Sequence, residues 1–238
     1  MHGPSLIAIA HRGASAYVPE NTVAAFDHAL ELGCVHVELD VRLSADGVPV
    51  VIHDATLDRT TNGHGPVAAQ PWLELRCLDA GSWMHPRFAG LRIASLDEAL
   101  AAIWPRATPL LELKEPIAPA IIEPLLRKHG AMEDALIGSF DPNILLPFRR
   151  RFAGLHLAVH AQQWSGDLLA TCRRLAASVV VLNVTAVNVD HVRAARQANL
   201  EVWVYTVNDV GLLAACAAMG VRGVITDQPD LVRRKRAI

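Results

Sequence analysis

The chain has 238 residues, of which 52% are hydrophobic and 19% are charged, and its formal net charge is −2. This length and apolar content favour a single domain over residues 1–238. The near-neutral charge offers no overall attraction to nucleic acid, and no apolar run reaches the roughly 20 residues that span a bilayer. We therefore expect neither a nucleic-acid partner nor stable membrane insertion. The start of the chain lacks a secretory-signal pattern, which favours a cytoplasmic location.

Short apolar runs alternate with amphipathic segments along the chain. Nine runs are typical of strands: Leu6–Ala10, Val35–Val41, Pro49–His53, Pro109–Lys114, Ala135–Ser139, Leu155–His160, Val179–Leu182, Val202–Val207 and Gly223–Thr226. Six segments have helical patterns: Asn21–Leu32, Ser95–Ile103, Ala118–His129, Asp167–Ala177, Asp190–Asn199 and Val210–Met219. This alternation predicts parallel strands joined by crossover helices, and hence an α/β fold.

Two architectures fit this alternation: an open doubly wound sheet and a closed (β/α)8 barrel. Polar residues stand at the carboxyl ends of at least four strand candidates, and barrels build their sites from the ends of many strands. We therefore predict a (β/α)8 TIM barrel. Nine candidates exceed the eight positions of such a barrel. Either one strand is extra, or Val35–Val41 and Pro49–His53 form a hairpin-like pair, because Arg42–Val48 is too short for a helix.

A small insertion is expected after the third strand candidate. Residues 54–92 show no clean period, are rich in glycine and proline, and hold Trp72, Trp83 and Phe88. A long irregular segment beside a functional residue often forms a lid or a substrate wall. A small satellite subdomain with its own aromatic core is an equally good interpretation, and the two are compatible.

Three carboxylates stand at strand positions that should face the barrel interior. Residues i and i+2 of a strand share a face, so Glu38 and Asp40 lie together while their neighbours face outward. Glu112 has a similar position on the Pro109–Lys114 strand. Each carboxylate alone would suit an ordinary ion pair, but buried charge is costly unless it is paired or binds a metal. Oxygen ligands without cysteine favour a divalent cation, Mg²⁺ or Ca²⁺, with Mn²⁺ as a further option.

Two histidines and two cationic residues follow the same strands. His11 comes directly after the first strand and His53 closes the third, where they fit a general acid and base pair. Arg12 offers a planar fork for phosphate oxygens, and Lys114 supplies a second positive charge. A cation site, an arginine and a lysine around one point predict a site for an anion such as phosphate. We interpret His160 and most other histidines as structural or solvated.

Several short motifs recur from the first strand to the last. They are His11-Arg12-Gly13, Pro19-Glu20-Asn21-Thr22, Glu38-Leu39-Asp40-Val41, Val50-Val51-Ile52-His53-Asp54, Arg59-Thr60-Thr61, Leu111-Glu112-Leu113-Lys114 and Ile225-Thr226-Asp227-Gln228-Pro229. Together they resemble the glycerophosphodiester phosphodiesterases over nearly the whole chain. The resemblance implies a barrel that uses a divalent cation to hydrolyse glycerophosphodiesters to sn-glycerol 3-phosphate and an alcohol.

The resemblance also implies roles for individual residues. In it, the three carboxylates bind the divalent cation and the two histidines act as acid and base. The two cationic residues lie at the phosphate. The family usually has a tryptophan where Tyr205 stands, and Trp203 lies two residues earlier on the same face. Both aromatic residues are therefore candidates for contact with substrate. In the mechanism we infer, one histidine deprotonates a glycerol hydroxyl that attacks phosphorus, and the other protonates the leaving alcohol.

Three alternatives compete with this interpretation. A phosphodiesterase of the same fold could act on lysophospholipids or phosphoinositides, although the relatives that cleave lysolipids tend to need disulfides, and no paired-cysteine pattern occurs here. A binding module without turnover would lack one of the charged positions, and all are present. A zinc amidohydrolase would need an HxH pair on an early strand, which is absent. The sequence leaves the oligomeric state, the alcohol head group and the assignment of acid and base open.

Overall fold

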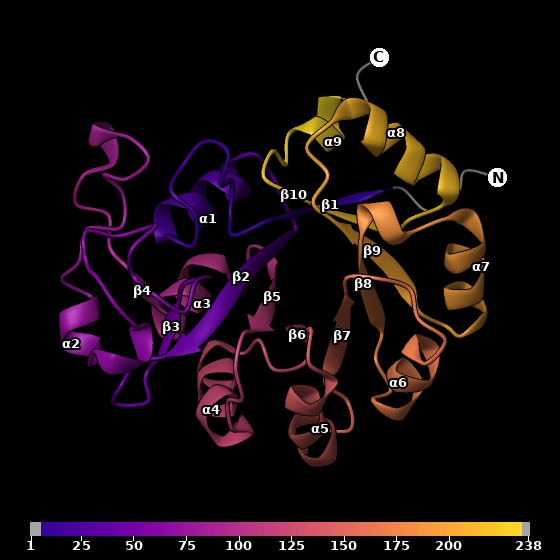
Figure 1. Ribbon diagram of the computed structural model, residues 1–238, viewed down its shortest axis with the longest axis horizontal. Helices are drawn as coiled ribbons and strands as arrows, with labels where there is room; N and C mark the ends of the chain where they lie inside the picture. The colour runs from indigo at the N-terminus through magenta and orange to yellow at the C-terminus, as the bar shows by residue number, and fades with distance from the viewer. Residues whose placement is uncertain (1–5, 235–238) are drawn as a thin grey trace.

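The computed structural model of the protein describes residues 6–234 and contains a closed barrel of eight parallel strands (Figure 1). The barrel strands are β1 (Ile7–Ala10), β2 (His36–Leu43), β5 (Thr108–Leu113), β6 (Leu136–Ser139), β7 (His156–Ala161), β8 (Val179–Asn183), β9 (Glu201–Tyr205) and β10 (Gly223–Thr226). β1 pairs with both β2 and β10, which closes the barrel. The predicted (β/α)8 barrel is confirmed.

A ring of helices surrounds the strands (Figure 1). They are α1 (Val23–Glu31), α3 (Leu96–Ile103), α4 (Pro119–His129), α5 (Pro142–Arg151), α6 (Leu168–Arg174), α7 (Val189–Gln197), α8 (Val210–Met219) and the short α9 (Leu231–Arg234). The sequence patterns missed α5, which contains Pro142 and Pro147. Proline is tolerated in the first turn, where Pro142 lies. Pro147 removes one hydrogen bond from a helix whose apolar face is buried.

Two further strands, β3 (Pro49–Val51) and β4 (Ala94–Ser95), lie outside the barrel. β3 pairs antiparallel with β2, and β4 pairs antiparallel with β3. The hairpin-like pairing predicted for Val35–Val41 and Pro49–His53 is therefore confirmed. Just beyond β3, the Ile52 N–H donates to the carbonyl of Asp40 at 3.0 Å. This bond brings His53, the next residue, beside the carboxyl end of β2.

Residues 54–92 connect β3 to β4 and contain three short helical turns: η1 (Val67–Ala69), α2 (Trp72–Leu75) and η2 (Pro86–Phe88). They pack on the hairpin through a small cluster of buried aliphatic side chains: Val50, Ile52, Leu57, Val67, Leu75, Ala80 and Ile93. Trp72 is only partly buried against this cluster, and Trp83 is 39% exposed. The segment thus has a small core of its own, which is aliphatic rather than aromatic.

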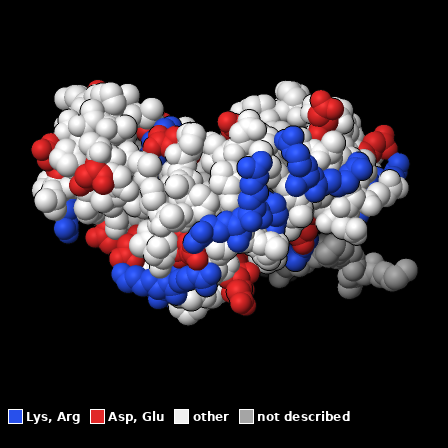
Figure 2. Space-filling model, turned by 90° about the horizontal axis from the view of Figure 1, so that it is seen from below, with Lys and Arg blue, Asp and Glu red and all other residues white. Residues whose placement is uncertain are grey.

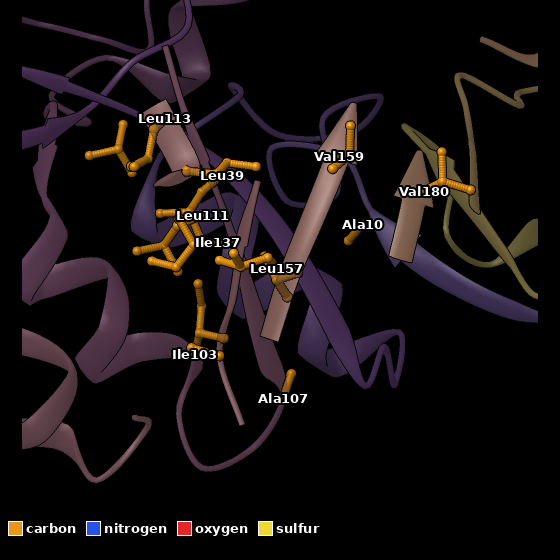
Figure 3. Close-up of a cluster of buried hydrophobic side chains, with 14 of the residues drawn as sticks. Ala10, Leu39, Ile103, Ala107, Leu111, Leu113, Ile137, Leu157, Val159 and Val180 are labelled. Carbon is orange, nitrogen blue, oxygen red and sulfur yellow. The ribbon is translucent and has the colours of Figure 1, made fainter. Parts of the chain in front are cut away.

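Neighbouring residues of each barrel strand face opposite sides of the wall. Leu111, Ile137 and Leu157 belong to the large cluster between strands and helices, part of which Figure 3 shows. Leu110 and Leu136, one position earlier, belong to a separate cluster inside the barrel. The alternation that fills both clusters also decides which polar side chains face inward.

Basic side chains gather on the face of the molecule seen in Figure 2. The last turns of α4, α5 and α6 all carry them, and the helix dipole stabilises positive charge there. Arg149 donates hydrogen bonds to the carbonyls of Phe152, Leu155 and Leu175, and so ties the end of α5 to two neighbouring segments. Across residues 6–234, no helix combines the length and apolar character needed to cross a membrane.

Candidate active site

A cavity of about 230 Å³ opens at the carboxyl ends of the barrel strands. Its lining residues are His11, Arg12, Glu38, His53, Glu112, Lys114, Phe140, His160, Gln162, Val181, Tyr205, Thr206 and Ile225. Most of the residues singled out from the sequence therefore converge on one place. None of residues 54–92, all of which the structure describes, lines this cavity, so the segment does not form its wall.

The three predicted metal ligands meet beside this cavity. One oxygen each of Glu38, Asp40 and Glu112 lies within 4.8 Å of the others, and all three side chains are buried. Asp40 and Glu112 are direct partners in the pairing of β2 with β5. Glu38 stands two residues before Asp40 on the same face of β2. Strand parity alone thus assembles the cluster.

The environment of Glu38 is short of positive charge. Burial and the nearby Asp40 carboxylate raise the pKa of Glu38 to about 8, because both disfavour its ionised form. The Oε1 atom of Glu38 is buried and accepts no hydrogen bond. A buried oxygen without a partner, next to two further carboxylates, is what a hard divalent cation satisfies. The residues present therefore fit such an ion.

Lys114 and Arg12 balance part of the negative charge. Lys114 Nζ lies 2.9 Å from Asp40 Oδ1 and also contacts Glu112 Oε1. Arg12 Nε lies 3.1 Å from Asp40 Oδ2, and the Arg12 backbone N–H donates to Glu38 Oε2 at 2.9 Å. Burial acts to lower the pKa of both basic groups, but the carboxylates outweigh it and raise both pKa values. Both side chains therefore stay cationic at the cavity wall.

A tight turn after β1 directs Arg12 toward β2. Arg12 has a φ of 56° and Gly13 a φ of 84°, and this left-handed conformation costs a residue other than glycine about 1–3 kcal/mol. A Cβ on Gly13 would also lie 2.6 Å from the backbone of Ala25 in α1. Position 13 therefore requires glycine, and Arg12 bears strain at the point where it meets the carboxylates.

An aspartate holds each predicted catalytic histidine. His11 Nδ1 lies 2.6 Å from Asp227 Oδ1, and His53 Nδ1 lies 2.6 Å from Asp54 Oδ1. Both rings line the cavity, and with Nδ1 engaged, Nε2 of each ring remains for a substrate. Burial acts to lower the pKa of His11, but the hydrogen bond to Asp227 and the charge of Glu38 outweigh it, so the pKa is raised.

Arg59 links the two sides of the site. It donates to Asp54 from Nε at 2.7 Å and to both oxygens of Glu20 at 2.8 Å. Glu20 in turn accepts a hydrogen bond of 2.8 Å from Arg12. A chain of charge-assisted hydrogen bonds thus runs from the aspartate of His53 to Arg12.

The structure separates the two aromatic residues predicted to contact substrate. Tyr205 lines the cavity. Trp203 is 2% exposed and lies deeper in the barrel, where its ring meets His36 and its Nε1 donates to Glu201. Residues i and i+2 share a face but lie nearly 7 Å apart along a strand. The face of Trp203 was therefore assigned correctly, but the residue sits too low to reach the cavity.

Sequence reasoning gave no role to several residues of the site, three of which contact predicted site residues. His160 and Phe140 line the cavity, and Asp227 holds His11. Strand parity could have found His160, because it shares the inward face of β7 with Ala158. Asp227 stood in the closing motif without an assigned role. Phe140 follows β6 and carries no signal of its own in the sequence.

A (β/α)8 barrel that gathers carboxylates, two histidines and two cationic side chains around one cavity suits a phosphodiesterase of the TIM-barrel class. Comparison with known proteins agrees with this class. The chain belongs to the glycerophosphoryl diester phosphodiesterase family, whose family model matches residues 11–231. It is a glycerophosphodiester phosphodiesterase, as the resemblance implied.

Individual relatives match the chain over nearly its full length. A glycerophosphodiester phosphodiesterase of Bacillus subtilis is 31% identical and covers 96% of this chain and 86% of the relative. One from Caldanaerobacter subterraneus is 34% identical, and the match covers 94% of this chain and 95% of the relative. An Oleispira antarctica phosphodiesterase has been solved in complex with the product sn-glycerol 3-phosphate. Its structure matches this one with a TM-score of 0.92 at 30% identity, and the match covers 99% of this chain and 98% of that chain.

Proposed function

We propose that the protein hydrolyses glycerophosphodiesters to sn-glycerol 3-phosphate and an alcohol, with a divalent cation held by Glu38, Asp40 and Glu112. The observation that carries this proposal is the meeting of these carboxylates with two histidines at one cavity of about 230 Å³. Charged and polar side chains form much of its lining, as a small, polar phosphodiester requires. The product bound to the Oleispira relative supports the same substrate class.

The identity of the cation belongs to the proposal. Mg²⁺, Ca²⁺ and Mn²⁺ all accept carboxylate ligands. When bound, the ion supplies Lewis-acid polarisation of a phosphoryl oxygen and lowers the pKa of a coordinated hydroxyl.

A cytoplasmic location and the lack of a nucleic-acid partner stay predictions.

His11 and His53 move the protons in this proposal. One Nε2 removes the proton of a glycerol hydroxyl, and the resulting oxygen attacks phosphorus to form a cyclic phosphate. The bond from phosphorus to the alcohol oxygen breaks, and the other Nε2 donates a proton to that oxygen. Water then opens the ring with the two roles reversed. Because the nucleophile is part of the substrate, the first step benefits from proximity.

Arg12 and Lys114 stabilise the negative charge that develops on the phosphate oxygens. Both already stand at the cavity wall as cations, so binding an anion only redirects donors that are in place. Tyr205 offers an aromatic surface for the carbon atoms of the glycerol. Its ring meets the ring of Phe140 edge-on, with centroids 5.7 Å apart, a geometry that aromatic pairs prefer.

The test measures sn-glycerol 3-phosphate released from glycerophosphocholine and glycerophosphoethanolamine, and choline released from lysophosphatidylcholine, with and without EDTA. We expect release from the two deacylated diesters, loss of activity in EDTA, and recovery with Mg²⁺, Ca²⁺ or Mn²⁺. Full activity in EDTA would contradict the cation. A cyclic phosphate that accumulates as the end product would favour the alternative substrate classes.

Replacing either histidine tests the proton transfers. His11→Ala and His53→Ala should each lower kcat by roughly 100-fold or more, the usual contribution of a general acid or base. His64→Ala is the matched control, because the side chain of His64 is 85% exposed and lies outside the cavity. Wild-type turnover in either of the first two variants removes that histidine from the mechanism.

A further inference from the structure

His160 is a buried histidine that the proposed reaction does not use. It stands on β7, is 3% exposed, and places Nδ1 3.2 Å from Glu112 Oε2. Glu112 belongs to β5, so the ring crosses the intervening strand β6 to reach it. Nε2 of His160 is buried and has no hydrogen-bond partner. The polar contact of the His160 ring is therefore the one between Nδ1 and Glu112.

Gly138 on β6 creates the space for this crossing. It pairs with Glu112 on one side and with Ala158 on the other, and its interior face lies under the ring of His160. A Cβ at position 138 would lie 2.5 Å from His160 Nε2. Glycine inside a strand is otherwise unfavourable, and it often marks a close approach of another group. The two residues thus form one arrangement across three strands.

This arrangement fixes the carboxylate of Glu112 at both oxygens. Oε1 contacts Lys114, which also reaches Asp40, and Oε2 faces His160. The ring of His160 is itself held edge-on by Phe140, with centroids 5.2 Å apart. With Oε1 held by Lys114 and Oε2 held by His160, the orientation of the Glu112 carboxylate is set before any ion arrives. Hydrogen-bonded partners of ligating carboxylates act in this way in metal sites.

We propose that His160 is a positioning residue that orients Glu112 for cation binding, and that Gly138 is required to admit its ring. The inference rests on the proposed cation site formed by Glu38, Asp40 and Glu112. It concerns affinity for the ion rather than the chemical step, because the ring, although it also lines the cavity, makes its polar contact with Glu112 and acts through it.

The experiment measures Mn²⁺ binding to the purified protein by isothermal titration calorimetry, with circular dichroism to verify the fold. His160→Leu removes the donor, and we expect binding about 10–100-fold weaker, the usual cost of losing such a partner. His160→Asn keeps an amide donor near the position of Nδ1, and we expect most of the affinity to return. A Leu variant that is folded and binds Mn²⁺ like the wild type overturns the proposal, as does an Asn variant no better than Leu.

Gly138→Ala gives an independent test in two backgrounds. In the wild type its methyl group meets the ring of His160, so we expect weaker Mn²⁺ binding. In the His160→Asn background the tip of the ring is gone, and the same change should have little further effect. Equal losses in both backgrounds would show that Gly138 acts without His160. If the wild-type protein itself binds no cation, the proposed function fails, whereas unchanged variants with a binding wild type overturn only this inference.

Discussion

At the scale of single residues, the two histidines share one local geometry in different surroundings. Both engage an aspartate through Nδ1 at 2.6 Å. Asp227 is held by the neutral donors Ser15 and Asn208, whereas Asp54 is held by the guanidinium of Arg59. Each ring therefore has a fixed tautomer and orientation, while the charge behind each ring differs.

Asp227→Asn tests the role of the charge behind His11. The hydrogen bond to Asp227 raises the pKa of His11, so losing the negative charge should lower it. The limb of the pH profile of kcat/KM that reports His11 should therefore move to lower pH. Movement of the alkaline limb identifies His11 as the acid, and movement of the acidic limb identifies it as the base. A shift to higher pH would contradict the argument.

Cation affinity should depend on pH through Glu38. Burial and the charge of Asp40 raise the pKa of Glu38 to about 8, so below that pH Glu38 carries a proton that must leave before it can bind an ion. The apparent affinity for Mg²⁺ should rise with pH by up to about tenfold per pH unit and level off above pH 8. Calorimetry in buffers of different ionisation enthalpy measures the released proton. Glu38→Gln should bind more weakly and lose this pH dependence.

Residue types and strand parity were sufficient to predict much of the site. Strand parity predicted that Glu38, Asp40 and Glu112 face the barrel interior, and the structure brings the three together there. Sequence reasoning failed for Trp203, because parity fixes a direction but not a depth along the barrel axis. It also failed for Asp227, because its partner His11 lies at the other end of the chain and no local pattern connects the two.

At the scale of elements, the hairpin and the segment 54–92 form an attachment with its own small core. The segment contributes residues to the small aliphatic cluster but none to the lining of the active-site cavity. Its connection to the site is Arg59, which bonds Asp54 behind His53 and Glu20 behind Arg12. The attachment thus affects the reaction by orienting residues that touch the cavity.

Arg59→Gln should lower kcat by at least about tenfold, because the loss of even one of its hydrogen bonds to a carboxylate costs about 1.5 kcal/mol. KM should change less, since Arg59 does not line the cavity. Steady-state kinetics on glycerophosphocholine separates the two parameters. Arg59→Lys keeps the charge but loses the two-pronged contact with Glu20, and it should fall between wild type and Gln. Unchanged kcat in the Gln variant would leave Arg59 with a purely structural role.

The order of strands and helices was predictable from alternating apolar runs, and most elements lie where the patterns indicated. There are two exceptions. α5 was not predicted, although its two prolines stand at the same helix positions as those of the predicted α4. The two-residue strand β4 is too short to show a pattern. Which strand candidate lay outside the barrel depended on pairing between β2 and β3, a tertiary fact that periodicity does not contain.

At the scale of the whole molecule, the barrel wall separates two apolar layers, and the outer layer is the larger. Its stability depends on side chains that touch both strands and helices. Leu157 is fully buried in this layer, so its loss opens a cavity that the closed wall cannot collapse to fill.

Leu157→Ala should therefore lower the free energy of unfolding by about 2–5 kcal/mol. Arg173→Ala, an exposed position on α6, should change it by less than about 0.5 kcal/mol. Urea denaturation followed by circular dichroism gives both values. A change below about 1 kcal/mol in Leu157→Ala would mean that the wall relaxes far more than a closed barrel should.

The pairing of His11 with Asp227 joins positions 216 residues apart. β1 has four register pairs with β10 but only two with β2, so the first barrel strand is secured chiefly by the last. A barrel from which β10 has come away still holds both histidines and all three carboxylates, but it lacks the aspartate that orients His11. Closure of the barrel and orientation of His11 are therefore one and the same event.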